Sequence, residues 1–317
     1  GVGWYRTEFD VPQFQAGKRA TILFDGAMSH ANVYINGQKV GYWPYGYNSF
    51  HFDITKYLKP GEKNTLAVRL ENLPESSRWY PGAGLYRNVH LIITEDAYIP
   101  VWGTYITTPS VNEKFAKVNV RTKVVLPEGA DPAKYSVETS VWNPNKQKLT
   151  AVRTSLAQMK YNNNQAEQEF VIQAPSLWSP EMPALYSAET RLYEGDKLKD
   201  IYTTPFGIRS IEIIPDKGFF LNGKRTVFKG VCNHHDLGPL GAAVNDAAIR
   251  RQIRILKDMG CNAIRTSHNM PAPDLVKACD EMGMMLMAES FDEWNVAKCK
   301  NCLLYTSDAA DEEDSVD

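Results

Sequence analysis

The sequence has few cysteines, no marked excess of either charge and no long apolar run. All five cysteines lie at or after Cys232, so no disulfide framework is expected. The formal net charge of −2, with acidic and basic residues interspersed, excludes the basic stripe that a nucleic-acid partner requires. No apolar run approaches the roughly 20 residues of a membrane span, and no signal peptide is visible. What remains is a globular chain of 317 residues, long enough for two or three domains.

The chain begins inside a strand pattern. Residues 4–9 already alternate, and no initiator methionine precedes Gly1, so we expect the N-terminus to be cut. The sequence leaves the compartment open between the cytoplasm and the periplasm. It also leaves the oligomeric state open.

Residues 1–97 predict an all-β sandwich of the jelly-roll type. Short alternating strands are separated by turn residues throughout this stretch. The clearest element is a hairpin, in which residues 31–35 and 38–40 flank Asn36-Gly37, the residue pair favoured in a type I′ turn.

One loop of this domain, residues 78–88, is unusually rich in aromatic residues and glycine. Aromatic rings, an amide and guanidinium groups together are what carbohydrate recognition requires. The alternative is that Trp79, Tyr80 and Tyr86 fasten the loop to its own domain. A second aromatic run, residues 42–47, follows the hairpin directly and is expected to pack within the sandwich.

Residues 98–212 predict a second β-sandwich, of the immunoglobulin-like type. Alternating runs recur at the spacing of such domains, although the Cys…Trp…Cys framework of antibody domains is missing. We expect this domain to carry no chemistry.

From residue 213 to 301 the pattern changes to strands alternating with helices, which predicts the first part of a (β/α)8 TIM barrel. The expected strands are residues 227–231, 263–265 and 284–288. Helices are expected from the cap Asn245 to Met259 and from Pro273 to Met282. Cys232, Cys261 and Cys279 fall in these strand or helix patterns and are expected as buried apolar thiols.

Each expected barrel strand ends in a polar cluster. The three clusters are residues 233–236, 265–268 and 289–294. Because chemistry in barrels lies at the carboxyl ends of the strands, we expect these clusters to share one rim. The alternative for any one of them is a structural loop. His234, His235 and Asp236 could form a metal cluster, but no further ligand follows at the spacing of the H-E-x-x-H zinc motif. The carboxylates Glu289, Asp292 and Glu293 either supply acid/base groups or hold Mg²⁺.

With two sandwiches and a barrel in this order, the chain resembles glycoside hydrolase family 2, the family of β-galactosidases, β-glucuronidases and β-mannosidases. The resemblance covers residues 1–301. It rests on residues 82–88, similar to the family's glycine-Ile-Tyr-Arg segment, on residues 228–235, similar to its first barrel strand, and on residues 262–268, similar to its signature. It implies a sugar-binding-like first domain and a β-linked glycan or oligosaccharide as partner.

The resemblance also implies roles for single residues. His234 and His268 correspond to substrate contacts, and Arg265 to the residue that positions the carboxylates of the site. Asn88 stands where some β-galactosidases place an Asp that reaches the substrate. Three further rim residues are His235, Glu289 and Glu293. Glu293 falls near a carboxylate that binds Mg²⁺ in some members, but no histidine repeats the second ligand, so no cofactor is assigned.

The family's reaction is retaining hydrolysis by two glutamates that stand roughly 5 Å apart. The resemblance places both on later barrel strands, so the acid/base and the nucleophile are expected beyond residue 301. We expect the parent protein to hydrolyse terminal β-galactosides and the chain itself to be inactive. β-Glucuronidase and β-mannosidase activity are alternatives within the family, and a non-catalytic carbohydrate-binding protein is the alternative outside it.

The end of the chain departs from this pattern. Residues 302–312 resemble a translated sequencing-library adapter, and residues 313–317 complete an acidic tail without apolar periodicity. Residues 302–317 are therefore expected to be a non-native tail.

Overall fold

The computed structural model of the chain describes residues 1–13, 17–158, 165–292 and 298–301. The chain divides into two compact units. One contains residues 1–93, 229–279 and the segment from 284 onward. The other contains residues 94–228 and 280–283. The expected non-native tail lies outside the described residues.

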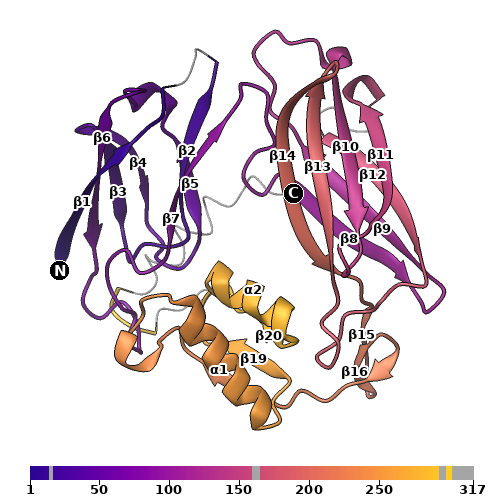
Figure 1. Cartoon of the computed structure of the whole chain (residues 1–317). Helices are drawn as coiled ribbons and strands as arrows, with labels where there is room; N and C mark the ends of the chain where they lie inside the picture. Colours follow the sequence, from indigo (N-terminus) through magenta and orange to yellow (C-terminus); the bar gives the residue numbers. More distant parts are fainter. Residues whose placement is uncertain (14–16, 159–164, 293–297, 302–317) are drawn as a thin grey trace. The chain divides into compact units, whose positions relative to one another are not determined.

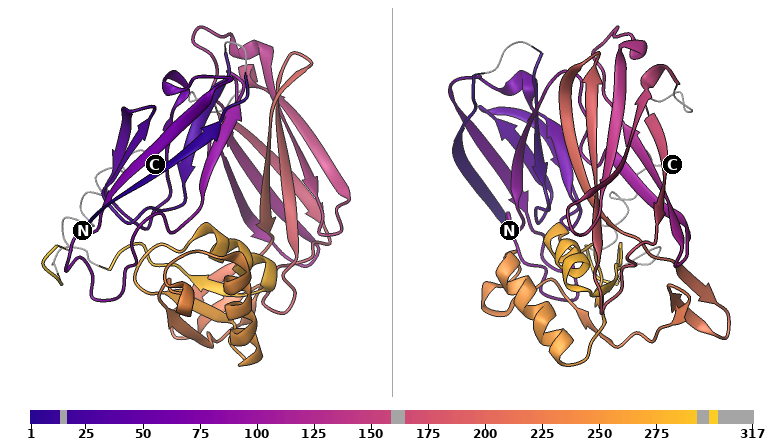
Figure 2. Two further views of the ribbon diagram at one scale, coloured as in Figure 1. Left: turned by 60° about the vertical axis from the view of Figure 1, so that its left-hand side comes forward. Right: turned by 45° about the vertical axis from the view of Figure 1, so that its right-hand side comes forward.

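The first unit begins with a β-sandwich of two antiparallel sheets (Figures 1 and 2). The larger sheet has the order β1 (Val2–Asp10), β6 (Lys63–Glu71), β3 (Ala31–Ile35) and β4 (Gln38–Trp43). The smaller has the order β5 (Phe50–Asp53), β2 (Arg19–Phe24) and β7 (Val89–Thr94). A short 3-10 helix spans Thr55–Tyr57. Alternate residues of β2 and β3 are buried, so one face of each sheet supplies the core. The predicted sandwich and its Asn36-Gly37 hairpin are confirmed.

The second unit holds the immunoglobulin-like sandwich, also as predicted. One sheet has the order β11 (Lys148–Ser155), β10 (Tyr135–Trp142), β13 (Leu185–Glu194) and β14 (Lys197–Gly207). The other has the order β12 (Gln165–Gln173), β9 (Phe115–Lys123) and β8 (Thr104–Val111). Short 3-10 helices span Pro132–Lys134 and Leu156–Gln158. A small sheet follows, made of β15 (Ile211–Ile214), β16 (Gly218–Leu221) and β17 (Lys224–Arg225).

The first unit is completed by the start of the barrel, in which three parallel strands alternate with helices (Figure 1). The elements are β18 (Gly230–Asn233), a 3-10 helix (Gly238–Leu240), α1 (Asp246–Asp258), β19 (Ala263–Thr266), α2 (Pro273–Met282) and β20 (Met285–Met287). As expected, the Asn245 side chain caps α1 by accepting from the Ala248 amide, and Ile249, Ile253 and Leu256 are buried.

The first barrel strand begins three residues later than predicted. Val227 and Phe228 are exposed and lie outside the sheet. The pairing begins at Gly230, where the lack of a side chain lets the two backbones approach, since a Cβ there would stand 2.4 Å from the carbonyl oxygen of Ala263 on the neighbouring strand. Close approach of the two backbones therefore sets the start of β18, which the apolar pattern does not reveal.

Among the described residues, neither α-helix combines the length and apolar character that crossing a membrane would need.

An aromatic cluster joins the first sandwich to the barrel start within the first unit. Tyr45 and Tyr47 are buried, and the Tyr45 hydroxyl donates to the carbonyl of Ser290 over 3.1 Å. The Tyr45 ring also lies 5.5 Å from the ring of Phe291. The prediction that the run 42–47 packs within the sandwich is confirmed for Trp43, which packs against the sandwich core, whereas Tyr45 and Tyr47 contact the barrel start.

His235 belongs to this cluster. Its Nε2 donates to the carbonyl of Pro81 over 2.8 Å, and its ring lies 5.0 Å from that of Tyr47. Burial, acting with the nearby Arg87 charge, lowers the pKa of His235 to about 4, so the ring is neutral at pH 7.

Asn64 is a second buried polar group on which the sandwich depends. Its side chain is fully buried and makes four hydrogen bonds. Oδ1 accepts from the Lys59 amide and from Asn36 Nδ2, and Nδ2 donates to the carbonyls of Lys59 and Glu62, all at 2.8–3.0 Å. One side chain therefore fastens the loop before β6 to the hairpin turn.

We expect Asn64→Ala to lower the free energy of unfolding of the first unit by about 2–4 kcal/mol, because buried donors and acceptors lose their partner. Urea denaturation followed by tryptophan fluorescence measures this loss. The matched control is Gln38→Ala, on the exposed side of the same hairpin, which should change stability little. Equal effects of the two substitutions would contradict the role of Asn64.

The first unit should lose stability as the pH falls from 6.5 toward 4. His235 takes up a proton more readily in the unfolded chain, so its neutral burial stabilises the fold above its unfolded pKa, and this contribution is lost on acidification. The expected loss is about 2–3 kcal/mol. Comparing urea midpoints across this range with those of His235→Gln, which keeps a donor for Pro81 but does not titrate, isolates the contribution. Parallel pH profiles for the two proteins would contradict it.

Candidate active site

The carboxyl ends of the three parallel strands form one rim. β18, β19 and β20 end at Asn233, Thr266 and Met287, in register. His234, His268 and Glu289 follow these ends directly or within two residues. Parallel pairing therefore brings together residues from all three predicted polar clusters.

The centre of the rim is a network of Arg265, His268 and Glu289. The Arg265 guanidinium forms an ion pair with Oε1 of Glu289. Nδ1 of His268 lies 3.0 Å from Oε2 of the same carboxylate. Nδ1 also lies 3.3 Å from Nη2 of Arg265, which only donates. Because the contact with the carboxylate, which only accepts, is the shorter of the two, we assign the proton of His268 to Nδ1, which leaves Nε2 for another partner. The Glu289 backbone amide donates to the Thr266 hydroxyl over 3.0 Å, which holds the backbone of Glu289 beside the end of β19.

This network is reachable from solvent. The side chains of Arg265, His268 and Glu289 retain 35%, 28% and 22% of their exposure. Cys232 is also exposed, and its Sγ accepts from Arg265 Nη1 over 3.5 Å. The expectation of a buried thiol is thus confirmed for Cys279 and wrong for Cys232.

Trp79, from the aromatic loop of the sandwich, forms one wall of the rim. Its ring stacks on that of His234 at 5.4 Å and lies 5.5 Å from that of His268. Its Nε1 donates to the Tyr47 hydroxyl over 3.1 Å. Trp79 therefore both fastens its loop and faces the rim, whereas Tyr86 is buried and donates to the carbonyl of Gly46. The aromatic residues beside Gly82 and Gly84 were the sequence signal for this wall.

Three other candidate residues lie elsewhere. Asn88 is exposed, and its Nδ2 donates to Asp274 in the first turn of α2 over 3.2 Å. His235 belongs to the aromatic cluster behind the rim. Glu293 lies outside the described residues.

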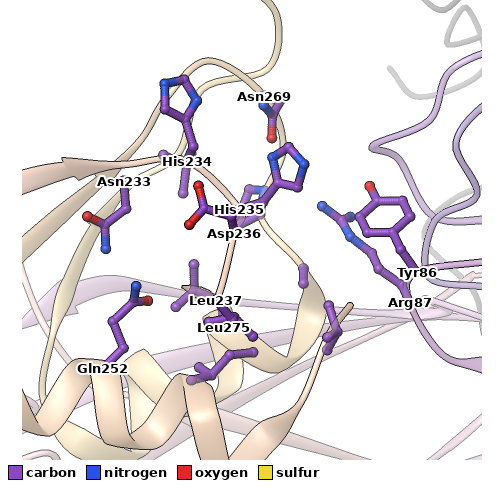
Figure 3. Close-up of a pocket in the computed structure, with 15 residues that line it drawn as sticks. Tyr86, Arg87, Asn233, His234, His235, Asp236, Leu237, Gln252, Asn269 and Leu275 are labelled. Carbon is purple, nitrogen blue, oxygen red and sulfur yellow. The ribbon is translucent and has the colours of Figure 1, made fainter. Parts of the chain in front are cut away.

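A small cavity lies behind the rim, between the sandwich loop and the barrel (Figure 3). Its volume is about 40 Å³, and its lining includes Arg87, His234, His235 and Asn269. A volume of this size holds water-sized groups and not a sugar ring. A sugar would therefore have to bind at the open rim of Arg265, His268 and Trp79.

The two described carboxylates of the third cluster, Glu289 and Asp292, are engaged with cationic side chains. Asp292 accepts from Arg78 over 2.6 Å and from Lys298 over 3.1 Å. Burial by itself raises the pKa of Asp292, but these two cationic partners outweigh it and lower the pKa. Glu289 is engaged with Arg265 and His268. Among the described residues, no three histidine, cysteine or acidic side chains are grouped to hold a metal ion.

The sequence contains one Asn-Glu pair, Asn112-Glu113, and it lies in the second unit. It forms the turn between β8 and β9, where Asn112 Oδ1 accepts from the amides of Lys114 and Phe115. This pair is a turn element of the second sandwich and does not belong to the rim.

Comparison with known proteins agrees with this architecture. Three models of glycosyl hydrolases family 2 match the chain in order: its sugar binding domain at residues 1–95, the family model at 98–209 and its TIM barrel domain at 212–315.

Individual relatives agree as well. The chain is 45% identical over 299 residues to the β-galactosidase BoGH2A of Bacteroides ovatus, and the aligned region covers 94% of this chain and 35% of that protein. It is 39% identical to a putative β-glucuronidase of Formosa agariphila, and this aligned region covers 93% of this chain and 28% of that protein. The chain thus spans about a third of the length of these curated relatives.

Solved structures show the same fold. A glycosyl hydrolase family 2 member from Bacteroides cellulosilyticus superposes with a TM-score of 0.91 at 36% identity, over 99% of this chain and 40% of that one. A β-glycosidase from Bacteroides vulgatus superposes with a TM-score of 0.90 at 34% identity, over the same shares. The order of the three domains, the network at the barrel strand ends and these matches agree: the chain belongs to glycoside hydrolase family 2.

Proposed function

We propose that this chain carries the substrate-binding rim of a retaining glycoside hydrolase that acts on terminal β-galactosides. The observation that carries the proposal is the network of Arg265, His268 and Glu289 at the strand ends, open to solvent and walled by Trp79. β-Galactosidases among the relatives support the choice of sugar. The binding partner is then a β-linked glycan or oligosaccharide.

Each rim residue has a role that its contacts support. The Trp79 ring offers an apolar face for the C–H bonds of a sugar. With Nδ1 committed to Glu289, His268 offers Nε2 to a sugar hydroxyl. Arg265 orients Glu289 by their ion pair, and His234 packs against Trp79. No step of this binding needs a cofactor, and the engagement of Glu289 by two partners argues against Mg²⁺ at that carboxylate.

The acid/base glutamate and the nucleophile are proposed to lie outside residues 1–301. The described barrel strands are β18, β19 and β20, whereas retaining hydrolysis in this family uses glutamates that follow later strands. Glu289 is held by a cation and a histidine, which suits positioning and not nucleophilic attack.

β-Glucuronide hydrolysis is the alternative with specific support. Several relatives bear that name, among them the putative enzyme of Formosa agariphila and one of Bacteroides fragilis. β-Mannoside hydrolysis and carbohydrate binding without catalysis are further alternatives. A purely binding protein has no need of the polar network at the strand ends, which is why hydrolysis is the preferred proposal.

We expect purified residues 1–317 to release no more p-nitrophenol from p-nitrophenyl β-D-galactoside than a matched blank, because both working carboxylates are proposed to lie outside residues 1–301. The assay is the absorbance of the released phenolate over long incubation. Hydrolysis that is abolished by His268→Ala would contradict the assignment of both glutamates to residues outside this chain.

The rim should still bind a planar sugar analogue. A galactonolactone mimics the flattened ring of the transition state, and we expect it to shift the imidazole signals of His234 and His268 in NMR titrations. His268→Ala should weaken this binding about tenfold, the effect of losing one strong hydrogen bond. His51→Gln, at an exposed position of β5 in the sandwich, is the control. Stronger shifts with the glucuronate-derived or mannose-derived lactone would favour those sugars instead.

A further inference from the structure

Three consecutive residues of the first sandwich contact the barrel loops behind the rim. The carbonyl of Tyr86 accepts from the amide of Val244, just before α1, over 2.8 Å. Arg87 Nη2 donates to the carbonyl of Met270, between β19 and α2, over 2.9 Å. Asn88 contacts Asp274 of α2. This short segment therefore contacts the chain just before α1, the loop between β19 and α2, and the first turn of α2 itself.

Arg87 is the most constrained of the three. Its side chain is 5% exposed, and Nη1 donates to the carbonyls of Asp25 and Tyr47 over 3.1 and 2.5 Å. Gly26 leaves room for it, because a Cβ there would stand 2.8 Å from Arg87 Cδ. The sandwich thus fixes the direction of the guanidinium before it reaches Met270.

The loop that Arg87 reaches carries His268. This loop is held at its start by the Ser267 amide, which donates to the carbonyl of Asn233 over 2.9 Å. Arg87 holds it again at Met270, and His268 lies between the two anchors. Figure 3 shows Tyr86 and Arg87 on the sandwich ribbon, facing His235 and Asn269 of the barrel.

We propose that Arg87 is a positioning residue of the active site, which acts through the Met270 carbonyl to hold His268 toward Glu289. The guanidinium is buried behind the rim, so it acts through the loop and not by direct contact with a ligand. Removing it frees one end of the loop while the Ser267 anchor and the barrel sheet stay in place. The consequence for sugar binding rests on the proposed function, whereas the consequence for the loop does not.

The test compares Arg87→Ala and Arg87→Lys with the control Arg69→Ala in the whole chain. Arg69 lies on the same sandwich, is partly exposed and pairs with Glu71. Amide hydrogen exchange in peptides that span residues 267–272 should become at least about tenfold faster in both Arg87 variants, since a charge-assisted hydrogen bond is lost. Exchange in β3 should stay unchanged, and Arg69→Ala should match the parent chain at both places.

A second measurement separates positioning from general stability. Galactonolactone affinity should fall about tenfold in Arg87→Ala at a temperature where the variant is fully folded, and added guanidinium at low, non-denaturing concentration should restore part of it. Arg87→Lys should not be restored, because the lysine side chain occupies the space. If Arg87→Ala does not fold, Arg87→Lys alone decides the exchange result.

The outcomes are distinct. Unchanged exchange at 267–272, or faster exchange everywhere including β3, would overturn the proposal and leave Arg87 as an ordinary core residue. If the parent chain binds no lactone, the proposed function fails, and the exchange result still decides the role of Arg87.

Discussion

Parallel pairing of β18, β19 and β20 is the constraint on which the candidate active site depends. Because parallel strands end at the same edge of a sheet, residues more than 50 positions apart, His234 and Glu289, are delivered to one rim. The ion pair of Arg265 with Glu289 then links the ends of two strands. Without the common register, each polar cluster would be an isolated loop.

The sandwich is part of the site and not an appendage to it. Trp79 supplies a wall, the tyrosines at 45 and 47 bury themselves against the barrel, and Arg87 reaches the loop that carries His268. These contacts between the sandwich and the barrel start have a physical reason. The short strands of the barrel start bury little apolar surface by themselves, so aromatic rings from the neighbouring domain stabilise the loops that the sheet leaves open.

Much of the fold followed from local patterns. The Asn36-Gly37 turn, the Asn245 cap and the alternation of β3 are decided by neighbouring residues, and the structure has them where they were predicted. The start of β18 was misplaced because the contact of Gly230 with Ala263 joins residues distant in the sequence. The exposed thiol of Cys232 and the barrel-facing Tyr45 were missed for the same reason: a strand pattern does not say which neighbour will cover each face.

The sequence by itself determined the three-domain order, the polar strand ends and the family, because turn residues, periodicity and motifs are local. Only the tertiary structure decided how those residues divide their work. In the structure, Arg265, His268 and Glu289 form one network. His235, predicted at the rim, packs in an aromatic cluster, and Asn88 donates to Asp274. Such choices depend on distances across the fold, and a distance between residues far apart in the chain is set only when the elements that carry them have packed.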